Sequence, residues 1–419
     1  MSKKIFTVAI LGAGARGAGA YGRLIHKRSD EFKIVALCDV SKERLDTFGE
    51  EFGIGSSSLF TDEEEFFKKK RADLVIIATQ DLDHVRHAKR AILLGYDILL
   101  EKPISSDRQE CRDLVNLAHE YNSRIIICYI LRYAPIYARV KELIERGEIG
   151  KLQEIEWTEP VGYEHYTHSF VRGNWRNTDV AHPMILAKCS HDLDFIKWCA
   201  GGDCLYVSSM GDLSQFKSEN APEESPGRCT PCPRHDFCEF SAYTMYLKNW
   251  KRDGSPIDMK PYNVLTPAPV SEEALREAIE RGQYGRCVYH CDNNVVDHQT
   301  AYMEFENGVK ATLRMTAFES GDRVGIFKGD CGTIRFENDV ITVDKPGEDR
   351  KAIKECDICD THGYAHGGGD YFLIESLYGV LTGDSAPTAS LEESIESHLI
   401  GIAAEESRHS GGNKVLVHK

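Results

Sequence analysis

The sequence predicts an α/β protein with two domains: an N-terminal Rossmann domain, built on a doubly wound parallel sheet, and a C-terminal α/β domain with a large, mostly antiparallel open sheet. Three observations predict it. Short apolar runs alternate with helical patterns early in the chain, a glycine-rich turn follows the first run, and later runs alternate with a period of two residues. Strands that alternate with helices build parallel βαβ units, whereas a two-residue period is typical of a sheet with one exposed face.

The elements of the first domain, predicted over residues 1–128, follow from apolar periodicity. Gly95 ends one helix at a plausible C-cap position. Strands are expected over 5–11, 33–40, 72–79, 97–100 and 124–129, and helices over 21–27 and 88–94.

The second domain, predicted over residues 129–419, begins with an amphipathic helix over 137–146 and ends with helices over 370–381 and 391–409. The segment 216–290 starts with a polar stretch rich in Pro and Gly and contains several cysteines, so we predict that it is an inserted lobe. Strands of the open sheet are expected over 153–159, 204–209, 300–305, 308–316, 324–328, 332–337 and 340–343.

Composition excludes several classes of protein. The formal net charge of −15 argues against a nucleic-acid surface, which needs a basic stripe. No apolar stretch is long enough to span a bilayer, and the N-terminal apolar run reads as a buried strand and not as a signal peptide. The 14 cysteines therefore indicate reduced thiols, and we expect a cytoplasmic protein without a membrane or nucleic-acid partner.

A dinucleotide site is predicted at the glycine-rich turn, which carries Gly12, Gly14, Ala15, Arg16 and Gly17. Such a turn between a strand and a helix lets the backbone approach a pyrophosphate at the start of the helix. Asp39 ends the second strand, where a carboxylate binds ribose hydroxyls and repels a 2′-phosphate. The pattern favours NAD over NADP; a simple turn and a turn acid are the alternatives.

Two further strand ends bring polar side chains to the same edge of the sheet. Thr79 and Gln80 follow the third strand and are expected to line the cofactor cleft; His84 either joins them or packs its own helix. Glu101 and Lys102 follow the fourth strand. Lys102 is expected at the nicotinamide, where it would donate a hydrogen bond to a reacting oxygen.

Together with Arg132–Pro135, Gly147–Lys151 and His191–Asp194, these motifs resemble the glucose–fructose oxidoreductase/inositol dehydrogenase (Gfo/Idh/MocA) family over nearly the whole chain. The resemblance implies an NAD- or NADP-binding oxidoreductase that acts on sugars, inositols or related polyols. It also implies substrate binding and oligomerisation by the second domain, as a homodimer or homotetramer.

The resemblance further implies two catalytic residues, the lysine Lys102 and a histidine that matches His191. Helical spacing puts Lys188, His191 and Asp194 on one face, so that Asp194 would orient the imidazole. A core histidine with a surface ion pair is the alternative. Family dehydrogenases often carry an aspartate at the position of Ala187, and this departure leaves the choice of base open.

The segment 162–177 precedes this helix and is rich in aromatic and polar donors that suit a sugar. Its two arginines hint at an anionic substituent, such as a uronate or sulfate. An interface loop is the alternative. The expected substrate contacts are Tyr166, His168, Arg172, Trp175 and Arg176.

The inserted lobe contains Cys229 and Cys232 in a Cys-x-x-Cys arrangement, with Cys238 close by and Cys287 following. Thiolates at this spacing indicate a structural zinc first and an iron–sulfur cluster second. Free buried thiols are the alternative.

Three functions remain open from the sequence. The first is an NAD(H)-dependent oxidoreductase of a sugar, inositol or related polyol. The second is a glycoside-cleaving enzyme that oxidises its substrate transiently with NAD and then eliminates the aglycone. The third is a non-catalytic protein that senses NAD or a sugar, against which the presence of both Lys102 and His191 argues.

Overall fold

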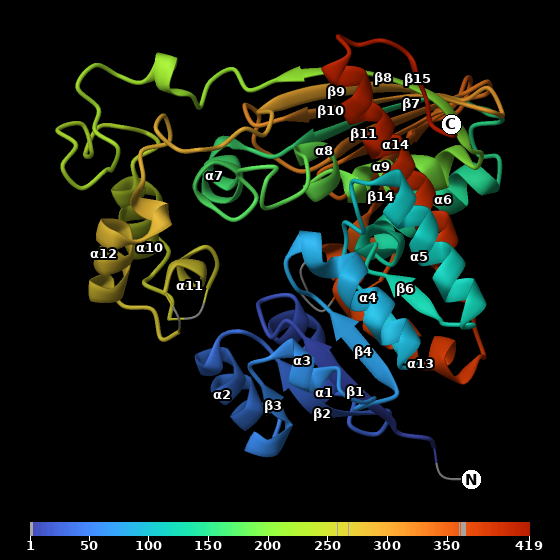
Figure 1. Ribbon diagram of the computed structural model, residues 1–419. Helices are drawn as coiled ribbons and strands as arrows, with labels where there is room; N and C mark the ends of the chain where they lie inside the picture. Colours follow the sequence, from blue (N-terminus) through green and yellow to red (C-terminus); the bar gives the residue numbers. More distant parts are fainter. Residues whose placement is uncertain (1–2, 258, 267, 360, 362–365) are drawn as a thin grey trace.

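The computed structural model describes residues 3–257, 259–266, 268–359, 361 and 366–419. Its elements form two sheets and a separate helical lobe (Figure 1). The predicted fold class is confirmed: a parallel six-stranded sheet comes first in the chain, and a nine-stranded, mostly antiparallel sheet follows. No helix in the described part of the chain has the length and apolar character needed to cross a membrane.

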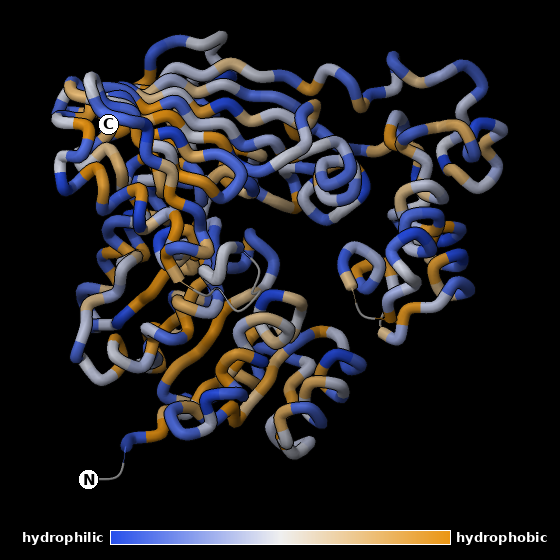
Figure 2. The backbone as a smooth tube through the Cα atoms, turned by 180° about the vertical axis from the view of Figure 1, so that it is seen from behind, coloured by the Kyte–Doolittle hydropathy of each residue, from blue (hydrophilic) through white to orange (hydrophobic). Residues whose placement is uncertain are grey.

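The first sheet has the order β3-β2-β1-β4-β5-β6 with every pairing parallel. Parallel strands are covered on both faces, which explains why β4 and nearly all of β1 are buried. Figure 2 shows these strands as hydrophobic stretches. The strands are β1 (Phe6–Leu11), β2 (Phe32–Cys38), β3 (Leu59–Phe60), β4 (Leu74–Ile77), β5 (Asp97–Leu100) and β6 (Ile125–Ile127).

Side-chain caps fix where several helices of this domain begin. Ser41, Asp62 and Asp107 each accept a hydrogen bond from a backbone N–H in the first turn of the following helix. The glycine-rich turn leads into a π-helical segment, Gly17–Gly22, that continues as α1. The helices are α1 (Arg23–His26), α2 (Lys42–Glu51), α3 (Glu63–Phe66), α4 (His84–Leu93) and α5 (Arg108–Glu120).

The second sheet has the order β14-β13-β12-β11-β7-β10-β9-β8-β15, and only its β7–β10 pair is parallel. Figure 2 shows hydrophilic and hydrophobic residues alternating along its strands, as expected for a sheet with one covered face. Its strands are β7 (Leu152–Pro160), β8 (Cys204–Asp212), β9 (His298–Phe305), β10 (Lys310–Thr316), β11 (Val324–Gly329), β12 (Thr333–Glu337), β13 (Val340–Asp344), β14 (Lys351–Lys354) and β15 (Val415–Leu416).

Helices cover the inner face of this sheet and join it to the first domain. The long helix α14 packs against β8, α9 and α5, so it contacts both domains (Figure 1). Trp157 of β7 is fully buried against Phe195 of α9. The helices outside the lobe are α6 (Pro135–Glu145), α7 (Tyr163–Tyr166), α8 (Met184–Ala187), α9 (Ser190–Ala200), α13 (Gly369–Thr382) and α14 (Leu391–His409), with a π-helical segment at Thr167–Arg172.

The segment 216–290 leaves the large sheet and forms a lobe beside the first domain (Figure 1). Most of the lobe's buried apolar side chains form a hydrophobic cluster of their own, which includes Tyr246, Trp250, Tyr262 and Leu275. The lobe is therefore a packed unit and not a bare loop. It contains α10 (Asn249–Arg252), α11 (Tyr262–Leu265), α12 (Glu272–Arg281) and a π-helical segment at Tyr243–Lys248.

Candidate active site

A cavity of about 810 Å³ lies between the glycine-rich turn and the inserted lobe. The first domain contributes residues 13–16, Arg23, side chains from 41–48 and the strand end 78–80. The second domain contributes side chains from 164–175, and the lobe contributes side chains between positions 245 and 284. This place, beyond the carboxyl ends of β1, β2 and β4, is where doubly wound sheets bind ligands.

The glycine-rich turn leaves room for a pyrophosphate. A Cβ at Gly12, whose φ is +93°, would lie 2.3 Å from the carbonyl oxygen of Ala78, so the turn itself requires glycine there. A Cβ at Gly14 would meet nothing within 4 Å, and Gly14 lines the cavity. Open space over a backbone that precedes a helix fits a dinucleotide phosphate.

Arg16 of this turn holds two buried carboxylates. Its guanidinium donates to Glu101 at 2.8 Å and to Asp370 of α13 at 2.7 and 3.1 Å. Burial raises the pKa of Glu101, but the cations of Arg16 and Lys102 outweigh it and hold that pKa below its usual value. His366 also contacts Asp370 at 3.0 Å, so α13 is tied to the cofactor turn.

The end of β2 carries the expected ribose acid. Asp39 accepts from the backbone N–H of Ser41 at 2.8 Å and lies 3.6 Å from the guanidinium of Arg44. Ser41 and Arg44 line the cavity. One carboxylate oxygen is thus held by the protein, and Asp39 itself is buried behind Ser41 and Arg44 and does not line the cavity.

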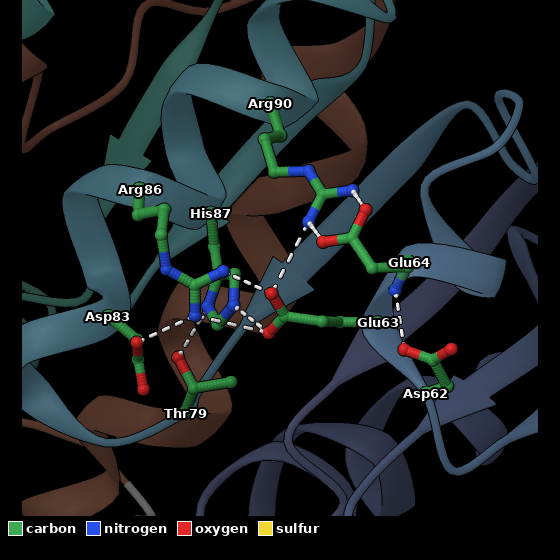
Figure 3. A network of polar contacts seen from close by, with 8 residues as sticks. All are labelled: Asp62, Glu63, Glu64, Thr79, Asp83, Arg86, His87 and Arg90. Atoms are coloured by element: carbon green, nitrogen blue, oxygen red, sulfur yellow. Dashed lines mark hydrogen bonds and ion pairs between the residues drawn. The ribbon is translucent and has the colours of Figure 1, made fainter.

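Thr79, at the end of β4, is positioned by a polar network on α3 and α4 (Figure 3). Its hydroxyl bonds His87 Nδ1 at 3.0 Å, and His87 Nε2 bonds Glu63 at 2.7 Å. Thr79 and Gln80 both line the cavity. His84 is buried instead, with Nδ1 2.7 Å from the carbonyl oxygen of Pro103, so it packs two loops together.

Lys102 lies beyond the end of β5 and connects the domains. Its ammonium donates to the carbonyl oxygen of Ala187 at 3.0 Å. Burial lowers the pKa of Lys102, the carboxylates of Glu101 and Asp81 oppose this, and the cations of Lys188 and Arg16 add to the lowering. Lys102 does not line the cavity. Its neighbour Glu101 accepts a hydrogen bond from Arg16, and Arg16 does line the cavity.

His191, near the start of α9, carries an imidazole nitrogen without a partner. Its Nδ1 is buried and has no hydrogen bond within the described part of the chain, and the ring contacts Tyr129 edge to face. Burial holds the pKa of His191 well below its usual value, and the charge of Lys102 adds to this. The neutral imidazole therefore has a free polar atom close to Lys102.

Lys188 belongs to a separate buried network. Its ammonium lies 3.1 Å from Glu159, which also pairs with Arg323 at 2.8 Å. Burial raises the pKa of Glu159, but Arg323 and Lys188 together hold it below its usual value. Arg323 also pairs with Asp192 at 2.6 Å.

Asp194 does not orient His191 as expected. Both of its carboxylate oxygens accept from Arg132, each at 2.8 Å. The two side chains are almost fully buried, at 1% and 2% exposure. Helical spacing puts Asp194 on the same helix face as His191, but both carboxylate oxygens of Asp194 accept hydrogen bonds from the guanidinium of Arg132.

The expected substrate segment divides into two groups. His168 and Trp175 line the cavity, and Trp175 donates to Asp81 at 3.0 Å. Tyr166 and Arg172 are fully buried, and Tyr166 donates to the carbonyl oxygen of Val295. Arg176 pairs with Asp292 at 2.9 Å and does not line this cavity.

The four cysteines expected to hold zinc do line one small cavity of about 30 Å³, together with Arg172. Within the described ranges, however, no three His, Cys, Asp or Glu side chains are arranged to hold a metal ion. The structural zinc is therefore not supported. Arg172 donates to the carbonyl oxygens of Arg286 and Phe240, at 2.8 and 2.6 Å, and links α7 and its π-helical extension to the lobe.

Comparison with known proteins identifies the family. Residues 6–129 match an oxidoreductase family with an NAD-binding Rossmann fold, and residues 141–417 match the C-terminal α/β domain of the same family. The chain belongs to the Gfo/Idh/MocA oxidoreductase family. The resemblance inferred from the motifs is thus confirmed, and with it the enzyme class.

Individual Gfo/Idh/MocA relatives are distant. YteT of Bacillus subtilis is 21% identical over 377 residues, which cover 85% of this chain and 84% of YteT. Glycosyl hydrolase family 109 protein 4 of Phocaeicola vulgatus is 28% identical over 180 residues, which cover 42% of this chain and 34% of that protein. A levoglucosan dehydrogenase in complex with NADH and levoglucosan shares the fold, with a TM-score of 0.70, 14% identity and 99% and 100% coverage.

Several residues of this Gfo/Idh/MocA site were missed by sequence reasoning. Asp370 joins the site through Arg16, and Glu159 joins it through Lys188 and Arg323, all distant in sequence. Lys260 and Tyr262 of the inserted lobe line the cavity, and nothing in their sequence surroundings connects them with a dinucleotide. The glycine run 367–369 left a role for Asp370 or His366 open, but the sequence favoured a simple turn there.

Proposed function

We propose that the protein transfers a hydride between NAD(H) and a sugar, inositol or related polyol, with Lys102 and His191 as its catalytic residues. The observation that carries the proposal is the hydrogen bond from the ammonium of Lys102 to the carbonyl oxygen of Ala187, four residues before His191, whose buried Nδ1 has no partner among the described residues. The levoglucosan dehydrogenase of the same fold, solved with NADH and an anhydrosugar, supports the substrate class.

NAD fits the residues that would hold it. Gly14 would give the pyrophosphate open backbone, Asp39 would offer a carboxylate to the ribose hydroxyls, and Thr79 and Gln80 line the cavity. When bound, NAD supplies the hydride acceptor, and NADH the donor.

The protein's own residues then handle the proton. In the oxidative direction, the substrate C–H bond breaks as the hydride leaves, and the hydroxyl proton passes to the neutral imidazole of His191. The ammonium of Lys102 donates to the same substrate oxygen and stabilises its developing negative charge. In the reductive direction the proton returns from His191 to the carbonyl oxygen.

The test is incubation with NAD and a panel of free sugars, inositols and aryl glycosides, with NADH absorbance and released aglycone followed together. We expect NADH to accumulate with at least one free sugar or polyol. Lys102→Met and His191→Asn should each reduce kcat by at least about 100-fold, because each removes a group that acts on the reacting oxygen. Glu306→Gln, on an exposed turn, is the matched control and should leave kcat unchanged. Absence of NADH with every free sugar would contradict the proposal.

A second candidate is NAD-dependent glycoside cleavage by transient oxidation and elimination. Two observations favour it: the 28% identity to a glycosyl hydrolase family 109 protein, and the Lys188–Glu159 ion pair beside Ala187, where family dehydrogenases often carry an aspartate. Oxidation at a ring carbon acidifies the neighbouring C–H, a base removes that proton, the aglycone leaves, and the hydride returns after water adds. Aglycone release that requires NAD without net NADH would establish this function instead.

A further inference from the structure

The inserted lobe forms one wall of the cavity whose opposite wall is the glycine-rich turn. Figure 1 shows the lobe beside the first domain, and Arg252, Lys260 and Tyr262 are among its residues on the cavity. Tyr262 is also part of the lobe's own hydrophobic cluster, so this wall is held by packing. A dinucleotide on the glycine-rich turn would therefore have lobe side chains on its outer side.

The cavity is cationic although the protein is acidic. The chain has a formal net charge of −15, yet the cavity is lined by five cationic side chains and by only two carboxylates, Glu43 and Glu164. A cation on this wall that no carboxylate pairs with would favour a small anion. The cations are Arg16, Arg23, Arg44, Arg252 and Lys260.

Lys260 differs from the other four cations. Each of the four arginines pairs with a carboxylate, the longest pair being 3.6 Å between Arg44 and Asp39. Lys260 forms no hydrogen bond or ion pair with any residue that the structure describes. Among the five cavity cations, Lys260 is therefore the one without a carboxylate partner in the described part of the chain.

Lys260 and the glycine-rich turn line the same cavity, and the charges at the turn act on Lys260 across it. Partial burial lowers the pKa of Lys260, the guanidinium of Arg16 lowers it further, and Asp370 and Glu101 oppose both. Arg16 forms ion pairs with both Glu101 and Asp370, so these three charges lie together at the turn. Lys260 and Arg16 therefore bring two cations toward one space, an arrangement that an anion between them would stabilise.

We infer that the inserted lobe completes the dinucleotide site and that Lys260 binds the pyrophosphate from the side opposite the glycine-rich turn. The inference rests on the proposed cofactor. The turn offers backbone N–H groups to one side of the pyrophosphate, and the ammonium of Lys260 gives the other side a charge-assisted hydrogen bond. Lys260 is a positioning and binding residue for the cofactor and takes no part in the transfer of hydride or proton.

The test is calorimetric titration of the full-length protein with ADP-ribose, which carries the pyrophosphate, and with adenosine, which lacks it. Lys260→Gln should weaken ADP-ribose binding about tenfold and leave adenosine binding within about twofold, because only the lost charge-assisted contact differs. Lys260→Arg should retain most of the affinity. Lys251→Gln is the matched control, since Lys251 lies on the same lobe, pairs with Glu272 at 2.8 Å and does not line the cavity.

The outcomes separate this inference from the proposed function. Equal ADP-ribose affinity in the wild type and Lys260→Gln would overturn the inference, even if the variant raised KM for a sugar, since Lys260 would then bind a substrate anion. Equal weakening of adenosine and ADP-ribose would also overturn it. Failure of the wild type to bind ADP-ribose or NAD at all would overturn the proposed cofactor itself. Unchanged circular dichroism of the variant checks that the exposed substitution leaves the fold intact.

Discussion

At the scale of single residues, burial moves the pKa values of His191 and Lys102 in the same direction. Both are lowered chiefly because each positive charge loses solvation, and the charge of Lys102 lowers the pKa of His191 further. His191 is therefore neutral at pH 7 and ready to accept a proton, whereas the lowering of the Lys102 pKa brings the loss of its ammonium closer to neutral pH. The pair is suited to oxidation near and above neutrality.

This arrangement predicts the pH dependence of kcat/KM. Activity should fall at acid pH only below about 6.5, the ordinary pKa of histidine, because His191 must be neutral to accept the proton. Activity should also fall as the pH rises, because Lys102 must keep its proton. The midpoint of this alkaline limb should lie below about 10.4, the ordinary pKa of lysine. A pH profile with a steady-state NADH assay measures both limbs. An acid limb above pH 6.5 would contradict the role given to His191.

Asp194 illustrates how a residue on the expected helix face serves a different purpose. Its ion pair with Arg132 is buried, so removal of the carboxylate leaves the guanidinium without compensation. We expect Asp194→Asn to lower the free energy of unfolding by about 3–5 kcal/mol in denaturant titrations. The control, Asp203→Asn, loses only a pair with Lys197 whose carboxylate is 57% exposed, and it should change the free energy of unfolding by less than about 1 kcal/mol.

The same variant tests the catalytic alternative for Asp194. If its carboxylate oriented His191, Asp194→Asn would shift the acid limb of the pH profile. Because both oxygens bond Arg132, we expect the folded fraction of the variant to keep the wild-type limb.

At the scale of elements, the polar network of Figure 3 joins α3 to α4. Glu63 of α3 accepts from Arg86 and from His87 of α4. The hydrogen bond from Arg86 and then that from His87 lower the pKa of Glu63 to about 2, although burial opposes them. Through His87 the network also sets the position of Thr79.

This pKa predicts a pH-dependent contribution to stability. The folded pKa of Glu63 lies below its ordinary value of 4.5, so the stabilisation is present above about pH 4.5 and is lost as the pH falls toward about 2. Glu63→Gln should lower the free energy of unfolding at pH 7 by about 1–2 kcal/mol, a value reduced for solvent screening of this partly exposed group. The difference from wild type should shrink in denaturant titrations below pH 4.5. Glu64→Gln is the control, since Glu64 is 68% exposed.

The elements also show what sequence periodicity predicts and what it does not. The predicted helix over 391–409 coincides with α14, and the strand over 97–100 coincides with β5, because capping residues and apolar runs mark both. The strands β3, β14 and β15 were missed. They are two to four residues long and carry few buried side chains, so their pairing is decided by neighbouring strands and not by local pattern.

Some residues of the candidate site could be predicted from the sequence and others could not. Asp39, Thr79 and Lys102 were predicted at one edge of the parallel sheet because they follow buried strands, and of the three Thr79 lines the cavity. Tyr166 and Arg172 were predicted as substrate contacts but are fully buried and do not line the cavity, because the sequence did not show which way that segment's side chains point. Lys260 was not predicted, since the fold of an insertion decides which of its residues meet the cavity.

At the scale of the whole molecule, the large sheet has one covered and one open face. Helices α9 and α14 cover the inner face. On β8 and β9 the open face presents Met210 and Tyr302, with 67% and 42% exposure. A broad sheet face with exposed apolar side chains is suited to contact with a second copy.

We therefore expect a homodimer or homotetramer that pairs through this open face, with a mass of two or four times 47.1 kDa by light scattering. Met210→Arg together with Tyr302→Arg should shift the protein toward the monomer, because two charges on each copy would be desolvated without partners. Phe237→Arg, at 87% exposure on the inserted lobe, should leave the mass unchanged. The cavity between the glycine-rich turn and the lobe is formed within one chain, so a monomeric variant should still bind NAD. A wild-type mass of 47.1 kDa at micromolar concentration would contradict the assembly and leave the site's chemistry unaffected.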